Sequence, residues 1–304
     1  MSISWGGIID FVDHRGAMHC SWHKGEGEEL PARRSNQLVM SLLGFSFFLS
    51  GVSALLYQIV WQRALMRLAG ASTTSLAIVL AGVMAGLAAG AILGGAAFRR
   101  ARSAAYGYAA LELLIGASGL TFSLISGQSH FSSWFSFQSM SAGQAHQLRL
   151  AVASLIVALP AVLMGMTLPA VITAAQDEDG NEKSGAGLLY ALNLAGAFLG
   201  GTAGGFCIIP SFGLNNSLLT AAALNFLSAC LAVGTAGRLR PGSNFDGPSS
   251  VFEAGEAADE RIEAPDAVLL NCALVVSAVV SMMLEIVWAR LFTLVLGSST
   301  YSVA

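Results

Sequence analysis

Long apolar stretches separated by short polar segments run through most of this chain. Seven of the stretches contain enough residues to cross a bilayer, and they lie near residues 37–59, 73–98, 104–126, 148–175, 187–210, 215–236 and 267–289. A helix needs about 20 apolar residues to span the hydrocarbon core, and inside lipid every backbone polar group must be satisfied by the protein itself. The pattern therefore predicts an all-α, polytopic membrane helix bundle.

Two polar segments divide the chain into parts. Residues 1–35 are predicted to be an N-terminal tail, because they lack the apolar core and the cleavage site of a signal peptide. Residues 36–236 hold the predicted six-span bundle. Residues 237–266 mix Gly, Pro, Ser, Asp and Glu without helical periodicity, which is typical of a linker. Residues 267–304 contain the seventh span.

The seventh span repeats the first. When residues 50–77 are aligned with residues 277–304, 11 of the 28 positions are identical. In the first copy the identical positions are Ser50, Val52, Ile59, Val60, Trp61, Arg63, Gly70, Ser72, Thr73, Ser75 and Ala77. Six crossings separate the two copies, and an even number restores the same orientation, so we expect a parallel duplication. The seventh span would then begin a second repeat that is truncated at Ala304.

Basic residues are distributed unevenly between the loops. Eleven of the 15 lysine and arginine residues lie in the tail, in the turn at 99–102, at Lys183 and in the linker. These segments share one side of the membrane if each span crosses it once. Because cytoplasmic loops are enriched in lysine and arginine, this distribution predicts a cytoplasmic N-terminus.

Composition narrows the class of partner. With 55% hydrophobic and 11% charged residues, the chain is too apolar for a soluble domain, and the lipid bilayer is its expected surrounding. A net charge of −3 without a basic face makes nucleic acid an unexpected partner. The tail groups His14, His19, Cys20 and His23, but their spacing fits no standard zinc site. We therefore expect neither a metal nor a cofactor.

Glycines recur every four residues on two predicted spans. The positions are Gly82, Gly86, Gly90 and Gly94 on the second span, and Gly196, Gly200 and Gly204 on the fifth. Small residues on one face of a membrane helix let another helix approach closely. We expect both stripes to be helix-packing faces, serving either as fixed contacts or as surfaces along which helices slide during transport.

Polar residues at membrane depth are candidates for a solute pathway. Glu112 lies within the third span, where an ionisable side chain costs about 2.5–3.5 kcal/mol on insertion scales. Two hypotheses stay open for it: Glu112 faces a polar cavity and binds a cation or proton, or it pairs with an Asn or Arg of a neighbouring helix. Asn193 on the fifth span is a second candidate, and like Asn225 and Asn271 it can also bridge helices by hydrogen bonds.

Two prolines complete this candidate pathway. Pro160 and Pro169 on the fourth span each remove a helical donor, so they predict a bent or broken helix whose freed carbonyls face protein, water or a solute. Near the boundary of the seventh span, Glu285 and Arg290 are predicted to form a structural ion pair. Trp61 and Trp288 are predicted to be interfacial anchors.

Several of these segments carry a resemblance to a known family. They are the runs Ser50–Arg63, Leu111–Gly116, Leu159–Pro169, Tyr190–Gly196 and Pro210–Leu214. In this order they resemble the membrane portion of bacterial fused major-facilitator/spermidine-synthase-like proteins, over about residues 40–236 and again at 277–304. The resemblance implies a bacterial inner-membrane location. In the longest family members it also implies a cytosolic domain similar to polyamine aminopropyltransferases.

The catalytic part of that family has no counterpart in this sequence. No segment offers the strand-associated glycine-rich loop that binds decarboxylated S-adenosylmethionine, or the aspartate that deprotonates the amine, so we expect no enzyme activity. The resemblance leaves a transporter-like domain for polyamines or other small cations as one expectation. The alternatives are an anchor or scaffold for a separate polyamine-synthase-like domain, and an inactive truncated product. A second membrane half or a second copy of the chain are further expected partners.

Overall fold

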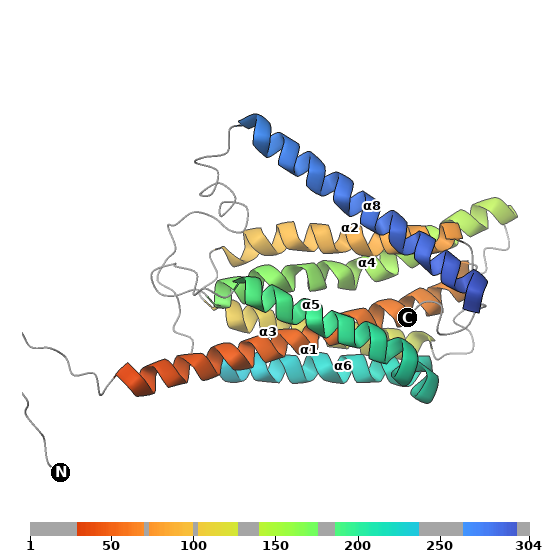
Figure 1. Ribbon diagram of the computed structural model, residues 1–304. Helices are drawn as coiled ribbons and strands as arrows, with labels where there is room; N and C mark the ends of the chain where they lie inside the picture. The colour runs from red at the N-terminus through yellow and green to blue at the C-terminus, as the bar shows by residue number, and fades with distance from the viewer. Residues whose placement is uncertain are drawn as a thin grey trace, which may run out of the picture.

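The computed structural model describes residues 29–69, 73–99, 103–126, 140–175, 186–236 and 264–296, and these residues are helical without any strand. Figure 1 shows the helices as a bundle of roughly aligned rods crossed by one oblique helix. The helices are α1 (Glu29–Ala69), α2 (Thr73–Phe98), α3 (Ala104–Ser126), α4 (Ala142–Ala174), α5 (Ala186–Ala203), η2 (Gly204–Ile208), α6 (Ile209–Ala236) and α8 (Ala264–Leu296). The prediction of an all-α membrane bundle is confirmed.

Six helical segments within the described ranges are long and apolar enough to cross a membrane. They are Leu38–Leu65, Leu76–Phe98, Ala104–Ile125, Ala142–Ala174, Ala186–Ala236 and Val268–Trp288. A helix makes most of its backbone hydrogen bonds within itself, as lipid requires. The chain is therefore a multi-pass membrane protein.

The fifth segment contains two of the predicted spans, joined by a sharp turn. Its 51 residues include the π-helical stretch η2, where the Ile209 N–H bonds to the carbonyl of Gly204. Gly213 follows with φ 76° and ψ 173°, a left-handed backbone conformation that glycine adopts without steric cost. The chain reverses there, and both α5 and α6 pack along α1 (Figure 1).

The ends of several helices differ from the predicted ones, most clearly in α1 and α4. α1 begins at Glu29, inside the predicted tail, and ends at Ala69 instead of residue 59. α4 begins at Ala142 instead of residue 148, because Ser141 and Gln144 form a capping box that satisfies the first free N–H groups. The remainder of the tail, the His/Cys cluster and most of the linker lie outside the described residues.

Close helix pairs organise the bundle. α2 lies along α4, and its four-residue glycine stripe faces that helix: a Cβ added at Gly90 would overlap the carbonyl oxygen of Val162. α1 lies along α5 in the same way, and a Cβ at Gly200 would overlap the carbonyl oxygen of Val52. Both glycine stripes therefore bring two backbones into direct contact. α3 packs on α4 and α6, and α6 packs on α1, which joins the two pairs.

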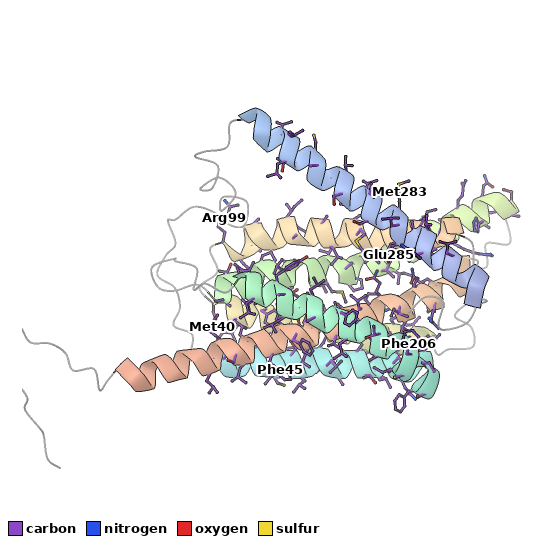
Figure 2. All side chains as sticks on the ribbon, viewed as in Figure 1. Met40, Phe45, Arg99, Phe206, Met283 and Glu285 are labelled. Carbon is purple, nitrogen blue, oxygen red and sulfur yellow. The ribbon has the colours of Figure 1, made fainter. Side chains whose placement is uncertain are left out.

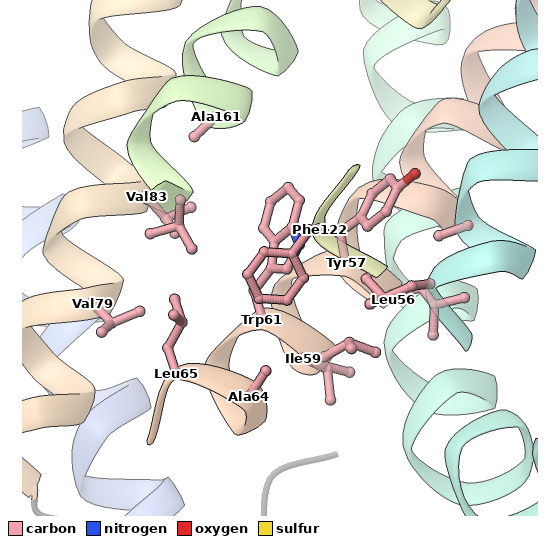
Figure 3. Packing of buried hydrophobic residues seen from close by; sticks show 14 of the residues in the cluster. Leu56, Tyr57, Ile59, Trp61, Ala64, Leu65, Val79, Val83, Phe122 and Ala161 are labelled. Atoms are coloured by element: carbon pink, nitrogen blue, oxygen red, sulfur yellow. The ribbon is translucent and has the colours of Figure 1, made fainter. Parts of the chain in front are cut away.

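Buried side chains form two apolar clusters along the bundle. The first core gathers around Tyr57, Trp61 and Phe122 and includes residues of α2, α4 and α6 (Figure 3). The second core lies toward the start of α1 and gathers around Phe47, Phe98 and Tyr108. Met40 and Arg99 lie at this same end of the bundle (Figure 2).

α8 lies outside the bundle. It crosses α2 obliquely and contacts it (Figure 1), while its described side chains are exposed or only partly covered. Its bounds enclose the predicted seventh span at 267–289. Whether it begins a second parallel repeat stays a prediction.

Candidate functional site

A group of buried polar side chains lies where α1, α3 and α6 meet, between the two apolar cores. We call it the buried polar cluster, and its members are Ser46, Ser50, Ser53, Tyr108, Glu112, Asn225 and Ser228. The three serines of α1 are four and three residues apart, which places them on one helix face. Tyr108 and Glu112 are likewise one turn apart on α3, and Asn225 and Ser228 share a face of α6. Helical spacing thus places the polar side chains of each helix on one of its faces.

One end of the cluster has all its hydrogen bonds made. Ser46 donates to the Ser228 carbonyl at 2.9 Å, and Ser228 donates to the Ser46 carbonyl at 3.0 Å. The two hydroxyls lie 2.9 Å apart, and the Tyr108 hydroxyl lies 2.9 Å from Ser228 Oγ and 3.3 Å from Ser46 Oγ. These contacts tie α1, α3 and α6 together without leaving a polar atom unsatisfied.

The other end of the cluster is centred on Glu112. Its side chain is fully buried, and Asn225 Nδ2 donates a hydrogen bond to Glu112 Oε2 at 2.6 Å. Ser50, Tyr108 and Ser228 also lie around the carboxyl group. However, Glu112 Oε1 and Asn225 Oδ1 are buried without a hydrogen-bond partner. A buried polar atom without a partner costs about 1–3 kcal/mol, so this arrangement calls for an explanation.

Further along α1, two aromatic side chains also bury polar atoms. Tyr57 and Trp61 stack with ring centroids 4.9 Å apart, and Trp61 meets Phe122 edge-on at 6.4 Å. Figure 3 shows these three rings at the centre of the first core. Trp61 is only 3% exposed, so the structure places it inside the bundle rather than at an interface as predicted. The Tyr57 hydroxyl and Trp61 Nε1 have no hydrogen-bond partner.

The other predicted pathway residues do not bond to Glu112. Asn193 donates instead to the backbone carbonyl of Phe47 at 3.0 Å, which bridges α5 to α1. Pro160 and Pro169 are buried within α4, which stays helical through both of them, so the helix is not broken at either proline. A bend at these positions stays a prediction. Next to Pro169, the Thr173 hydroxyl donates to the Pro169 carbonyl at 2.9 Å.

The helical spacing of polar residues in the sequence carries some information about the partners of Glu112, whereas the amino-acid composition carries none. The sequence pattern predicts only a general role for Asn225 as a bridge between helices, and it does not distinguish Ser46, Tyr108 or Ser228 from other polar residues of the spans. Serines at positions 46, 50 and 53 do form a polar stripe on an apolar helix. An apolar helix with one polar stripe does not indicate which neighbouring helices the stripe faces, so its contact with α3 and α6 is seen only in the structure.

The described side chains do not test the predicted ion pair between Glu285 and Arg290. Glu285 is exposed on α8 (Figure 2), and the side chain of Arg290 lies outside the described residues. Among the residues that the structure places, no group of three or more His, Cys, Asp and Glu side chains is positioned to hold a metal ion.

Comparisons with known proteins add no identity. No family model matches the chain, and no curated protein sequence matches it.

Proposed function

We propose that the helix bundle is a membrane transport domain and that Glu112 is its ion-binding group. The observation that carries the proposal is the buried carboxyl group of Glu112, which lies within a membrane-spanning helix and keeps one oxygen without a partner. Ionisable groups at membrane depth are costly, and they commonly serve ion or proton pathways. The hydrogen bond that Glu112 does accept comes from a neutral amide and not from a cation.

The substrate class in this proposal is a small organic cation such as a polyamine. It rests on the resemblance to spermidine-synthase-like membrane proteins, as do the bacterial inner membrane and the second membrane half as partner. The cytoplasmic N-terminus rests on the basic residues near 15–34 and 99–102. The alternative role is an anchor for a cytosolic polyamine-synthase-like domain, and an anchor needs no ionisable group inside its bundle.

The test is uptake of radiolabelled spermidine and putrescine into proteoliposomes under an imposed pH gradient or membrane potential. We expect the wild-type protein to accumulate label and Glu112→Gln to lose gradient-driven uptake. Glu285→Gln is the matched control, because Glu285 is exposed on α8, and it should keep wild-type uptake.

Two results would count against the proposal. Unchanged uptake in Glu112→Gln would remove Glu112 from the mechanism. Absence of uptake by the wild-type protein under both driving forces would favour the anchor role.

A further inference from the structure

The contact between Glu112 and Asn225 contains one hydrogen bond and two unsatisfied oxygens. Asn225 Nδ2 donates to Glu112 Oε2, while Glu112 Oε1 and Asn225 Oδ1 have no partner. An ionised carboxylate can only accept hydrogen bonds, and so can an amide oxygen. If Glu112 is ionised, Glu112 Oε1 and Asn225 Oδ1 are therefore both buried acceptors, and no proton lies between these two oxygens.

A single proton would satisfy both oxygens. A protonated carboxyl group has one O–H donor and one carbonyl acceptor, which matches the acceptor and donor of a primary amide. We propose that this site binds a proton on Glu112 Oε1, which donates it to Asn225 Oδ1, so that the two side chains form an acid–amide pair with two hydrogen bonds joining α3 to α6. The bond already present, from Asn225 Nδ2 to Glu112 Oε2, is the second half of that pair.

Among the described residues, no lysine or arginine lies beside Glu112 to balance the charge of an ionised carboxylate. The titratable groups that face it are Tyr57 on α1 and Tyr108 on α3. Neither α3 nor α6 contains a lysine or arginine, and Cys230 of α6 is exposed. The ionisable residues of α4 are His146 and Arg149, both near its start. An isolated carboxylate in such a setting is costly to bury, whereas a neutral acid with both hydrogen bonds made is not.

A metal cation fits this site less well than a proton. Oxygen-binding cations such as Ca²⁺ and Mg²⁺ take about six or more ligands. The side-chain oxygens left to serve here are those of Glu112, Asn225 and Ser50, because Ser46 and Ser228 each donate to a backbone carbonyl and the Tyr108 hydroxyl lies against both of them. A proton needs only the two oxygens that are left unsatisfied.

Release of the proton would change the contact between α3 and α6. Without the O–H donor, Glu112 Oε1 and Asn225 Oδ1 are again two acceptors in one contact, and one bond of the pair is lost. The bonds among Ser46, Tyr108 and Ser228 contain no group that this step alters. This inference rests on the proposed function for its role in transport, where it names the proton as the ligand of Glu112.

The bound proton is measured by infrared difference spectroscopy on the purified protein during a pH titration. We expect a carboxylic-acid carbonyl band in the wild type that converts to carboxylate bands as the pH rises. The band should be absent in Glu112→Gln and retained in Glu285→Gln. Glutamine presents the same donor and acceptor to Asn225 as a protonated Glu112, so Glu112→Gln should stay folded. In Asn225→Leu the band should move to higher frequency, because the acid loses both hydrogen bonds.

Other outcomes separate this inference from the transport proposal. Carboxylate bands of Glu112 at every pH would overturn the acid–amide pair, and so would a loss of the acid band on adding NaCl or KCl at constant pH. If the acid band is present but uptake is absent, the proton site stands and the transport proposal falls. If the band is absent while Glu112→Gln still abolishes uptake, transport stands with a different ligand.

Discussion

At the scale of single residues, the two ends of the buried polar cluster differ in how well their polar atoms are satisfied. Ser46 and Ser228 exchange several hydrogen bonds, and Tyr108 adds to them. Glu112 and Asn225 share one bond and leave two oxygens without partners. The first end is suited to holding helices together, and the second is suited to exchanging a ligand.

This difference predicts unequal costs for two substitutions. Tyr108→Phe should lower the free energy of unfolding by only about 0.6 kcal/mol, because Ser46 and Ser228 still donate to each other's backbone carbonyls. Asn225→Leu should cost about 1–3 kcal/mol, because the buried Glu112 carboxyl group then loses the hydrogen bond from Asn225 Nδ2. Titration with sodium dodecyl sulfate in mixed micelles measures both values. Equal costs would contradict the distinction between the two ends.

The sequence predicted the central residue of the site better than its partners. Glu112 stands out because a carboxyl group is rare in an apolar helix. The hypothesis that it pairs with an Asn of another helix describes the observed bond, but Asn225 could not be preferred to Asn193. Helices that are apolar on all sides show little sign of which face meets which neighbour. Partner choice depended on the arrangement of helices around α1.

At the scale of helices, the glycine stripe of α2 sets its distance from α4. Gly86 and Gly90 lie against backbone atoms of α4, where a side chain would overlap them. Gly95 lies on the same helix with no atom within 4 Å of an added Cβ. The close contact with α4 therefore depends on which face of α2 a glycine occupies and not on the number of glycines in the helix.

The pair Gly90→Ala and Gly95→Ala tests this contact. Gly90→Ala should destabilise the protein by about 1–3 kcal/mol, because α2 must move away from α4. Gly95→Ala should leave stability unchanged or raise it, since alanine is favoured over glycine in a helix by about 1 kcal/mol. Thermal unfolding in detergent compares the two variants. A stable Gly90→Ala protein would show that the two backbones are not in close contact.

Helix existence was predictable and helix ends were not. Each predicted span corresponds to a described helix or to one arm of a helical run, because apolar length is a strong signal in membrane proteins. The early start of α4 depends on the capping box at Ser141, which lies outside the apolar stretch. The joining of α5 to α6 depends on the backbone of Gly213 and on the π-helical turn before it.

At the scale of the whole molecule, the two copies of the sequence repeat differ in how deeply their side chains are buried. Val60 of α1 is fully buried, whereas the matching Val287 of α8 is 51% exposed. Val52 and Val279 differ in the same way, at 8% and 53%. The repeat thus preserves an apolar pattern that α1 uses for packing, while α8 exposes it among the described residues.

Substitution of one repeated valine in each copy should show this difference. Val60→Ala should lower the free energy of unfolding by about 1 kcal/mol, because it removes packing contacts in the first core. Val287→Ala should have little effect in the isolated chain. Unfolding measurements on both variants in the same detergent provide the comparison. A comparable loss in Val287→Ala would mean that α8 is covered in solution.

The backbone contacts of α2 with α4 and of α1 with α5 have a mechanical consequence. Helices that meet backbone to backbone along several turns have no layer of side chains between them that can rearrange. Each pair should therefore move as one rigid unit. The first core lies between the two helix pairs and consists of side chains, which rearrange more readily than backbones in direct contact. We expect any conformational change to be a sliding of one helix pair past the other. Tyr57 and Trp61 belong to the side-chain layer that would repack during this motion.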